Sequence, residues 1–175
     1  MAKIIGLKRR TVSLVPHNNK WFWLFEAEKK RLQKILGKDA IAIEHIGSTS
    51  VPGLAAKPVI DISVGLAGFK RGKAIIKEMT KAGYAYRPNW GRLDQHILFA
   101  KGNDKSRTHY LHFIKFKGIT WKKDILFRDY LRSHPATAKQ YGKLKYKLAK
   151  FYPNDRGSYT KAKTAFITTV LKRAK

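Results

Sequence analysis

The chain has 175 residues, of which 38 are Lys or Arg and 11 are Asp or Glu, so its formal net charge is +27 at pH 7. Its length and its hydrophobic fraction of 43% argue against disorder and favour a single domain over residues 1–175. The absence of cysteine excludes disulfides, thiolate metal sites and a cysteine nucleophile. No apolar run approaches the ~18 residues of a membrane span, so we expect a cytoplasmic protein with no membrane partner.

The first part of the chain has the patterns of a mixed sheet with two helices. Residues 21–36 have the apolar spacing of a helix, and Gly37 would end it. The near-continuous apolar run at 58–66 is typical of a central strand covered on both faces. The remaining patterns predict strands at 11–16, 41–46, 84–86, 97–99 and 110–116, a helix at 68–82, and turns or loops at 88–94 and 101–106.

From Thr120 onward the pattern is helical, with three segments divided near His134-Pro135 and at 152–154. The whole order predicts an α/β (α+β) fold, in which a mixed β-sheet with flanking helices is followed by a helical C-terminal part. Lys143, Lys147 and Lys150 would share one helix face. That face either follows a nucleic-acid backbone, with Tyr or Trp stacking on bases, or is the solvated side of an amphipathic helix.

The large positive charge bears on the partner. Charge of this size attracts polyanions over about a Debye length, ~8–10 Å. It therefore indicates nucleic acid or polyphosphate as a candidate partner. A generally Lys-rich composition explains the charge equally well, because the basic residues are dispersed along the chain.

The segment after the 41–46 strand carries the clearest chemical pattern. An apolar run ends in Gly47-Ser48, and small polar residues with a stiffening Pro52 follow. Glycine lets a backbone approach phosphate closely, and the next residue offers a hydroxyl and an N–H. We therefore expect Gly47, Ser48 and Thr49 to bind phosphate.

Asp61 lies inside the apolar run at 58–66. An unpaired carboxylate there would cost several kcal/mol. A divalent metal ion would compensate it, and so would an ion pair with Lys or Arg.

Several stretches together resemble the GrpB family, over roughly residues 10 to 170. The segments that carry the resemblance are 44–54 with 57–62, 12–16 with 21–28, 108–113, and 126–135. The resemblance implies a nucleotidyltransferase-like fold, in which the Gly47-Ser48 loop holds a nucleoside triphosphate and carboxylates on the next strand hold Mg²⁺ or Mn²⁺. It does not specify an acceptor.

One departure from the general nucleotidyltransferase pattern concerns the metal. That pattern has a second acid two residues after the first, on the same strand face. Here position 63 is Ser. Either the metal is held differently, or the chain has lost transferase chemistry.

Histidines and Glu44 are the other candidate metal ligands. His109 and His112, three apart on an expected strand, would point to opposite faces unless a bulge turns one of them. Either could act as a general base beside Asp61. His112, Glu44 and His45 are candidate metal ligands with Asp61, although only one of the adjacent Glu44 and His45 can face the site. Each histidine could equally be a packed structural residue.

Lys57 and Arg128 are the expected cationic partners of a bound phosphate, since arginine binds phosphate through two parallel hydrogen bonds. Arg128 could instead pair with Asp61 or Asp129. Two functions follow from these residues. The first is a metal-dependent nucleotidyltransferase-like enzyme with Asp61, His109 and His112 as catalytic candidates. The alternative is a catalytically inactive basic domain that binds nucleic acid or a nucleotide.

Overall fold

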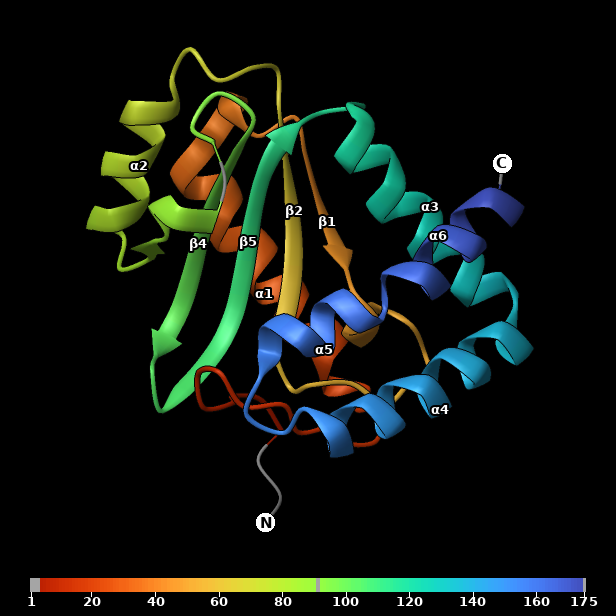
Figure 1. Cartoon of the computed structure of the whole chain (residues 1–175). Coiled ribbons are helices and arrows are strands. Elements are labelled where there is room, and N and C mark those ends of the chain that lie inside the picture. The colour runs from red at the N-terminus through yellow and green to blue at the C-terminus, as the bar shows by residue number, and fades with distance from the viewer. Residues whose placement is uncertain (1–3, 91, 175) are drawn as a thin grey trace.

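The structure is a computed structural model that describes residues 4–90 and 92–174. One five-stranded sheet in the order β1-β2-β5-β4-β3 forms its centre (Figure 1). β2 and β5 are parallel, and the other neighbouring strands are antiparallel. The strands are β1 (Ala42–Ile46), β2 (Ile60–Leu66), β3 (Ala85–Tyr86), β4 (His96–Asn103) and β5 (Ser106–Lys115).

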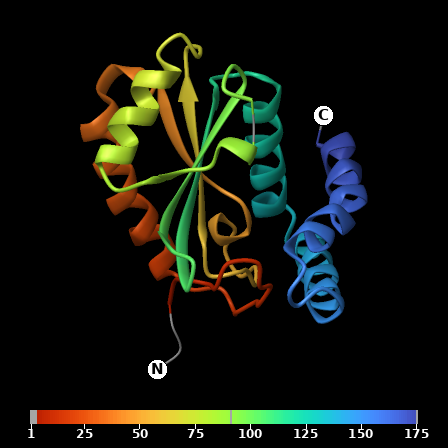
Figure 2. The same cartoon turned by 60° about the vertical axis from the view of Figure 1, so that its left-hand side comes forward.

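Helices cover both faces of the sheet, as the view along it in Figure 2 shows. One side carries α1 (Lys20–Leu36) and α2 (Gly72–Lys81), and the other carries α3 (Ile119–Ser133), α4 (Pro135–Phe151), α5 (Arg156–Ala162) and α6 (Thr164–Arg173). Short 3-10 turns occupy η1 (Gly37–Asp39), η2 (Ser48–Ser50) and η3 (Pro88–Trp90). The expected mixed sheet with flanking helices and a helical C-terminal part is confirmed.

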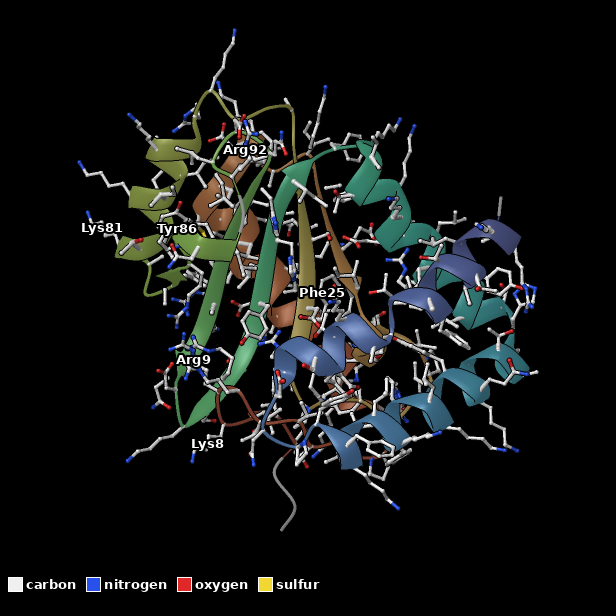
Figure 3. All side chains as sticks on the ribbon, in the orientation of Figure 1. Lys8, Arg9, Phe25, Lys81, Tyr86 and Arg92 are labelled. Atoms are coloured by element: carbon white, nitrogen blue, oxygen red, sulfur yellow. The ribbon has the colours of Figure 1, made fainter. Side chains whose placement is uncertain are left out.

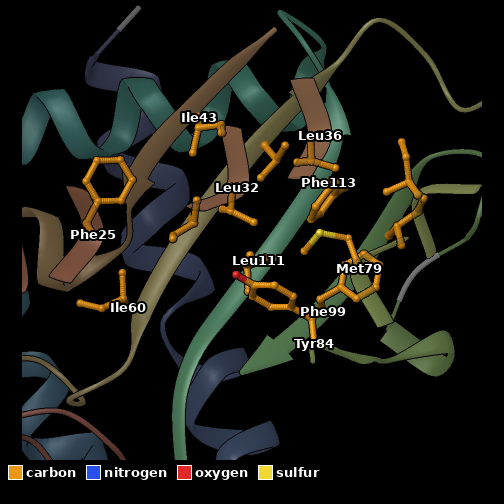
Figure 4. Packing of buried hydrophobic residues seen from close by; sticks show 14 of the residues in the cluster. Phe25, Leu32, Leu36, Ile43, Ile60, Met79, Tyr84, Phe99, Leu111 and Phe113 are labelled. Carbon is orange, nitrogen blue, oxygen red and sulfur yellow. The ribbon is translucent and has the colours of Figure 1, made fainter. Parts of the chain in front are cut away.

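The main core lies between the sheet and the helices α1 and α2 (Figure 4). β2 contributes Ile60, Ile62 and Val64 to it, and β5 contributes Leu111 and Phe113. Because successive side chains of a strand point to opposite faces, the residues between them face α3 to α6. The apolar alternation of β2 therefore places Asp61 and Ser63 on the side of the C-terminal helices.

One local prediction is wrong, and another is confirmed only in part. Residues 11–16 form no strand, and only Val15 makes an isolated bridge, with Ala56. Of the turn or loop expected at 101–106, only residues 104–105 form a turn, in a tight hairpin between β4 and β5, because the Asn103 side chain accepts hydrogen bonds from the backbone N–H groups of Lys105 and Ser106. That Asx-type turn replaces a longer connection.

Two element boundaries also differ from the predictions. The second helix begins at Gly72 instead of residue 68. The last helical part divides at Lys163, so four helices replace the three expected segments. No helix in residues 4–90 and 92–174 has the length and apolar character that a bilayer crossing needs.

Basic side chains are spread widely over the surface. In Figure 3, Lys8 and Arg9 lie together at the lower left of the molecule, Lys81 lies at its left edge and Arg92 lies near its top. Net charge alone therefore does not single out one binding surface. A functional site has to be located from the local geometry.

Candidate functional site

A cleft of about 450 Å³ opens between the sheet and the C-terminal helices. Gly47, Ser48 and Thr49 line it at the end of β1, and Asp61 and His112 line it from β2 and β5. The opposite wall comes from α3 to α6. Phe127, Tyr141 and Tyr159 give that wall an aromatic and apolar character.

Gly47 is fitted against Asp61. It has φ +69°, and a Cβ at this position would lie 2.9 Å from Asp61 Oδ2. Its carbonyl accepts a hydrogen bond of 2.6 Å from Ser50 Oγ, which ties the following η2 turn back onto it. A glycine is therefore required here twice, for the backbone conformation and for the close approach of the carboxylate.

Asp61 and His112 lie side by side on the parallel strands β2 and β5. His112 Nε2 is 3.9 Å from Asp61 Oδ1. Burial opposes ionisation of Asp61, but hydrogen bonding to His112 and the charge of that ring when protonated, with smaller effects of Lys57 and Arg156, outweigh burial and lower the pKa of Asp61. Asp61 is therefore a carboxylate at neutral pH.

The second ring nitrogen of His112 has a defined partner. His112 Nδ1 lies 3.1 Å from His96 Nε2, and the two rings stack with centroids 5.2 Å apart. Burial, and to a lesser degree the charge of His112, lowers the pKa of His96 to about 4. A neutral His96 thus orients the His112 ring and leaves Nε2 directed toward the side of Asp61.

A second carboxylate reaches this site from α3. Ser63 Oγ donates a hydrogen bond of 3.0 Å to Asp124 Oδ2. Burial raises the pKa of Asp124, opposed by His112 and by the Ser63 hydrogen bond, while the charge of Asp61 raises it further. A carboxylate from a helix is therefore hydrogen-bonded to the serine at position 63, where the general nucleotidyltransferase pattern has a second acid on the strand.

Basic side chains surround the two acids. Lys57, Lys123, Lys145, Arg156 and Lys163 line the cleft. Burial lowers the pKa of Lys57 to about 7, of Lys145 to about 6 and of Lys163 to about 8. Such lysines hold their protons best when an anion lies beside them, because desolvation disfavours the lone cation.

Lys145 and Arg156 are fixed by protein contacts. Lys145 is only 2% exposed, and its Nζ donates a hydrogen bond of 2.5 Å to the Ala55 carbonyl. Arg156 lies over the Tyr110 ring at 4.2 Å and donates a hydrogen bond to the Tyr110 hydroxyl. The cationic wall is therefore preorganised.

Two of the predicted histidines lie on the other side of the sheet. His45 stacks on Phe25 of α1 with centroids 4.8 Å apart, and its Nε2 shares a 2.9 Å hydrogen bond with Thr49 Oγ1. His109 and His112 are three residues apart on β5, so they point to opposite faces of the sheet, and His109 Nδ1 shares a hydrogen bond of 3.0 Å with Thr108 Oγ1. Burial lowers the pKa of His45 to about 3 and of His109 to about 4, so both are neutral.

Arg128 and Glu44 bind each other outside the cleft. Arg128 Nη1 donates hydrogen bonds of 2.6 Å to Glu44 and 3.1 Å to the His45 carbonyl, and its Nε donates one of 2.8 Å to Asp129. Of the pairings considered for Arg128, that with Asp129 is confirmed and none with Asp61 is seen. The pair joins α3 to β1, and neither side chain is among the described residues that line the cleft.

The four predicted metal ligands Asp61, His112, Glu44 and His45 do not converge. In the described part of the chain, no group of three or more His, Cys, Asp or Glu side chains is arranged to hold a metal ion. The chemistry that fits better is a Mg²⁺ or Mn²⁺ ion bound by one or two carboxylates together with substrate phosphates. Asp61 and Asp124 are the carboxylates available in the cleft.

Sequence reasoning missed the contribution of the C-terminal helices. Asp124, Lys145, Arg156 and Lys163 carry no recognisable motif. A weak signal was present for Lys145, which continues the buried face of α4 formed by Ala138, Tyr141 and Gly142. A lysine on the apolar side of a helix indicates a buried cation with a specific partner.

Comparisons with known proteins assign the chain to a family. The family model described as "GrpB protein" matches residues 11–173. The "Glutamate-rich protein GrpB" of Alkalihalophilus pseudofirmus is 37% identical over 171 residues, with 96% of this chain and 98% of that protein covered. The crystal structure of conserved protein GrpB from Enterococcus faecalis has a TM-score of 0.83 and 36% identity, and covers 93% of this chain and 96% of its own.

A more distant similarity connects the chain to part of a larger enzyme. A "Dephospho-CoA kinase" of Mycobacterium leprae is 26% identical over 180 residues, covering 87% of this chain but only 44% of that protein. The family match and the solved structure agree over nearly the whole chain. This chain therefore belongs to the GrpB protein family.

Proposed function

We propose that this protein is a metal-dependent nucleotidyltransferase-like enzyme that binds the phosphates of a nucleoside triphosphate in the cleft beside Gly47-Ser48. One observation carries the proposal. A glycine loop, the adjacent carboxylate Asp61 and a wall of five basic side chains surround one cavity of about 450 Å³. That composition suits a polyanion with an associated cation better than a neutral substrate.

The basic side chains would hold the phosphates. Lys57 approaches from the segment before β2, whereas Lys123, Lys145 and Arg156 belong to α3, α4 and α5, and Lys163 lies between α5 and α6. Preorganised cations in a partly desolvated cleft neutralise charge that develops on a transferring phosphoryl group. The aromatic wall of Tyr141 and Tyr159 would accommodate the less polar part of the nucleotide.

Asp61 and Asp124 would hold the divalent cation, with phosphate oxygens completing its ligands. A cation so bound supplies charge neutralisation at the phosphates. The raised pKa of Asp124 and the nearby charge of Asp61 fit two carboxylates that favour a shared cation. Ser63 orients Asp124 through its hydrogen bond.

His112 would accept the acceptor's proton. In the proposed transfer, an acceptor oxygen forms a bond to the α-phosphorus, and the bond to the α–β bridging oxygen breaks. Pyrophosphate leaves with that electron pair, and the acceptor proton passes to His112 Nε2. The similarity to part of a protein named as a kinase supports phosphate chemistry without specifying the acceptor.

Isothermal titration of nucleic-acid-free protein with each of the four nucleoside triphosphates, with and without Mg²⁺ or Mn²⁺, tests the proposal. We expect metal-dependent binding that weakens at least about tenfold in Asp61→Asn and in Asp124→Asn, a loss of ~1.4 kcal/mol. Asp94→Asn is the matched control, because Asp94 is exposed and pairs with Arg92 away from the cleft.

The alternative of a catalytically inactive basic domain gives a different result. Binding would then be independent of metal, would fade with salt, and would be unchanged in Asp61→Asn. Pyrophosphate release from the bound nucleotide in the presence of candidate acceptors separates an active enzyme from a nucleotide-binding domain.

A further inference from the structure

Two open hollows adjoin each other on the surface beside α4, because Pro52 and Arg132 line both of them. The larger hollow has a volume of about 870 Å³ and a floor that includes Leu54, Ala138 and Gly142. The smaller, of about 330 Å³, lies at the start of α1. Together they form one continuous surface, which meets the nucleotide cleft at a single shared residue, Thr49.

Exposed aromatic side chains stand at both ends of this surface. Phe22 and Trp23 line the smaller hollow and are 53% and 69% exposed. Their rings contact each other edge to face at 5.0 Å. Tyr146 lines the larger hollow and is 44% exposed. Single exposed aromatic residues are ordinary, but three on one hollowed surface indicate a ligand that stacks on rings.

The same surface is positively charged. Arg132, Lys139 and Lys143 line the larger hollow, and within the described residues no Asp or Glu lines either hollow. Helix α4 contains no acidic residue in its 17 positions. Lys147 and Lys150, which were expected to share a helix face with Lys143, do not line the hollows, so Lys139 and Lys143 are the lysines of α4 that do.

We propose that this surface, defined by Phe22, Trp23, Arg132, Lys139, Lys143 and Tyr146 and called here the α4 surface, binds single-stranded nucleic acid. Bases stack on the exposed rings, and the phosphates lie along the cations between them. This combination is typical of proteins that bind single strands without reading sequence. An acidic amphipathic peptide would also meet the cations, but it would leave the widely spaced rings at the two ends without matching partners.

The α4 surface does not depend on the proposed nucleotide site. The smaller hollow shares Thr49 with the cleft, but none of the six residues that define the α4 surface lines the cleft, and the larger hollow shares no residue with it. Loss of nucleotide binding in Asp61→Asn therefore leaves this proposal intact, and the reverse also holds.

Fluorescence anisotropy with a labelled oligouridylate of about 12 nucleotides, at about 0.15 M salt, tests the α4 surface. We expect Trp23→Ala and Tyr146→Ala each to weaken binding roughly fivefold or more, because each variant loses the stacking of one base on a ring. The charge reversal Lys139→Glu/Lys143→Glu should weaken binding at least about tenfold and reduce its salt dependence.

The matched control is Lys73→Glu/Lys77→Glu. These lysines have the same spacing at the start of α2, on the other side of the sheet, and both are exposed. Both double variants lower the net charge from +27 to +23, since each Lys→Glu change removes one positive charge and adds one negative charge. An equal loss of affinity in the control would overturn the proposal, because overall charge would then account for binding.

Three further results would also overturn it. One is absence of binding by the unaltered protein, and another is unchanged affinity in both ring variants. The third is equal affinity for a duplex of the same length, because paired bases cannot stack on the rings. An oligodeoxythymidylate of equal length then shows whether the surface takes RNA or DNA, and either preference supports a single-strand site.

Discussion

The two faces of the sheet treat ionisable groups in opposite ways. On the face of α1 and α2, the buried Glu28 accepts hydrogen bonds of 2.6 Å from the Tyr84 hydroxyl and 2.5 Å from Lys101 Nζ. On the face of α3 to α6, five basic and two acidic side chains line an open cleft. Charges matched by protein partners support the fold, whereas an excess of one sign around a cavity indicates a ligand.

The largest loss of stability is expected from Glu28→Ala, on the face of α1 and α2. The change leaves Lys101 and the Tyr84 hydroxyl without their acceptor, and breaking a buried ion pair costs about 3 kcal/mol or more. Urea unfolding measures this loss in the free energy of unfolding. Glu26→Ala on the same helix is the control and should change stability by less than about 0.5 kcal/mol. Loss of nucleotide binding in a folded Glu28→Ala protein would contradict the division between the faces.

A smaller change in the free energy of unfolding is expected from the titration of Lys145 as the pH changes. The unfolded chain keeps the lysine proton up to about pH 10, whereas burial lowers the folded pKa to about 6. Between these values the unfolded state binds more protons, so stability rises with pH, by about 2 kcal/mol from pH 6 to pH 8. Lys57 and Lys163 act in the same direction over their own ranges.

Urea unfolding of Lys145→Met at both pH values checks this assignment. Methionine keeps the apolar stem without the charge, so the rise in stability with pH should become shallower. Lys139→Met on the exposed side of α4 should leave the slope unchanged. A slope that is identical in Lys145→Met and the unaltered protein would mean that Lys145 titrates normally.

The smallest change in stability is expected from substitution of Gly47, and it tests why glycine is needed there. Gly47 and Gly53 both have positive φ, at +69° and +73°, but a Cβ at Gly53 would meet nothing within 4 Å. Gly53→Ala therefore measures backbone strain alone, of about 1 kcal/mol. Gly47→Ala adds the clash with Asp61 and should cost about 1 kcal/mol more while also weakening nucleotide binding. Equal losses of stability would show that Asp61 moves aside.

Much of the fold follows from local patterns. The apolar spacing of 21–36 predicted α1 to within one residue, and Gly37 ends it with φ +50°. The run at 58–66 predicted the central strand β2. The strand at 11–16 failed because a short β-rich segment needs neighbouring strands to pair with, and only Val15 finds a partner.

The site was predicted in part. Gly47, Ser48, Thr49, Lys57, Asp61 and His112 do line one cleft. His45 and His109 face the other side of the sheet. For His109 the reason is that no bulge in β5 lies between it and His112, so the two side chains point to opposite faces. Their chemical roles, and that of the metal, stay predictions.

The sequence by itself determined the family, the order of helices and strands, and the loop with its carboxylate, because these depend on residues close together in the chain. Tertiary structure decided which charges meet. Asp124 lies 61 residues from Ser63, to which it is hydrogen-bonded, and Lys145 lies 90 residues from the carbonyl that it contacts. No local pattern encodes contacts between residues so far apart in the sequence, because these contacts depend on how α3 to α6 fold back over the sheet.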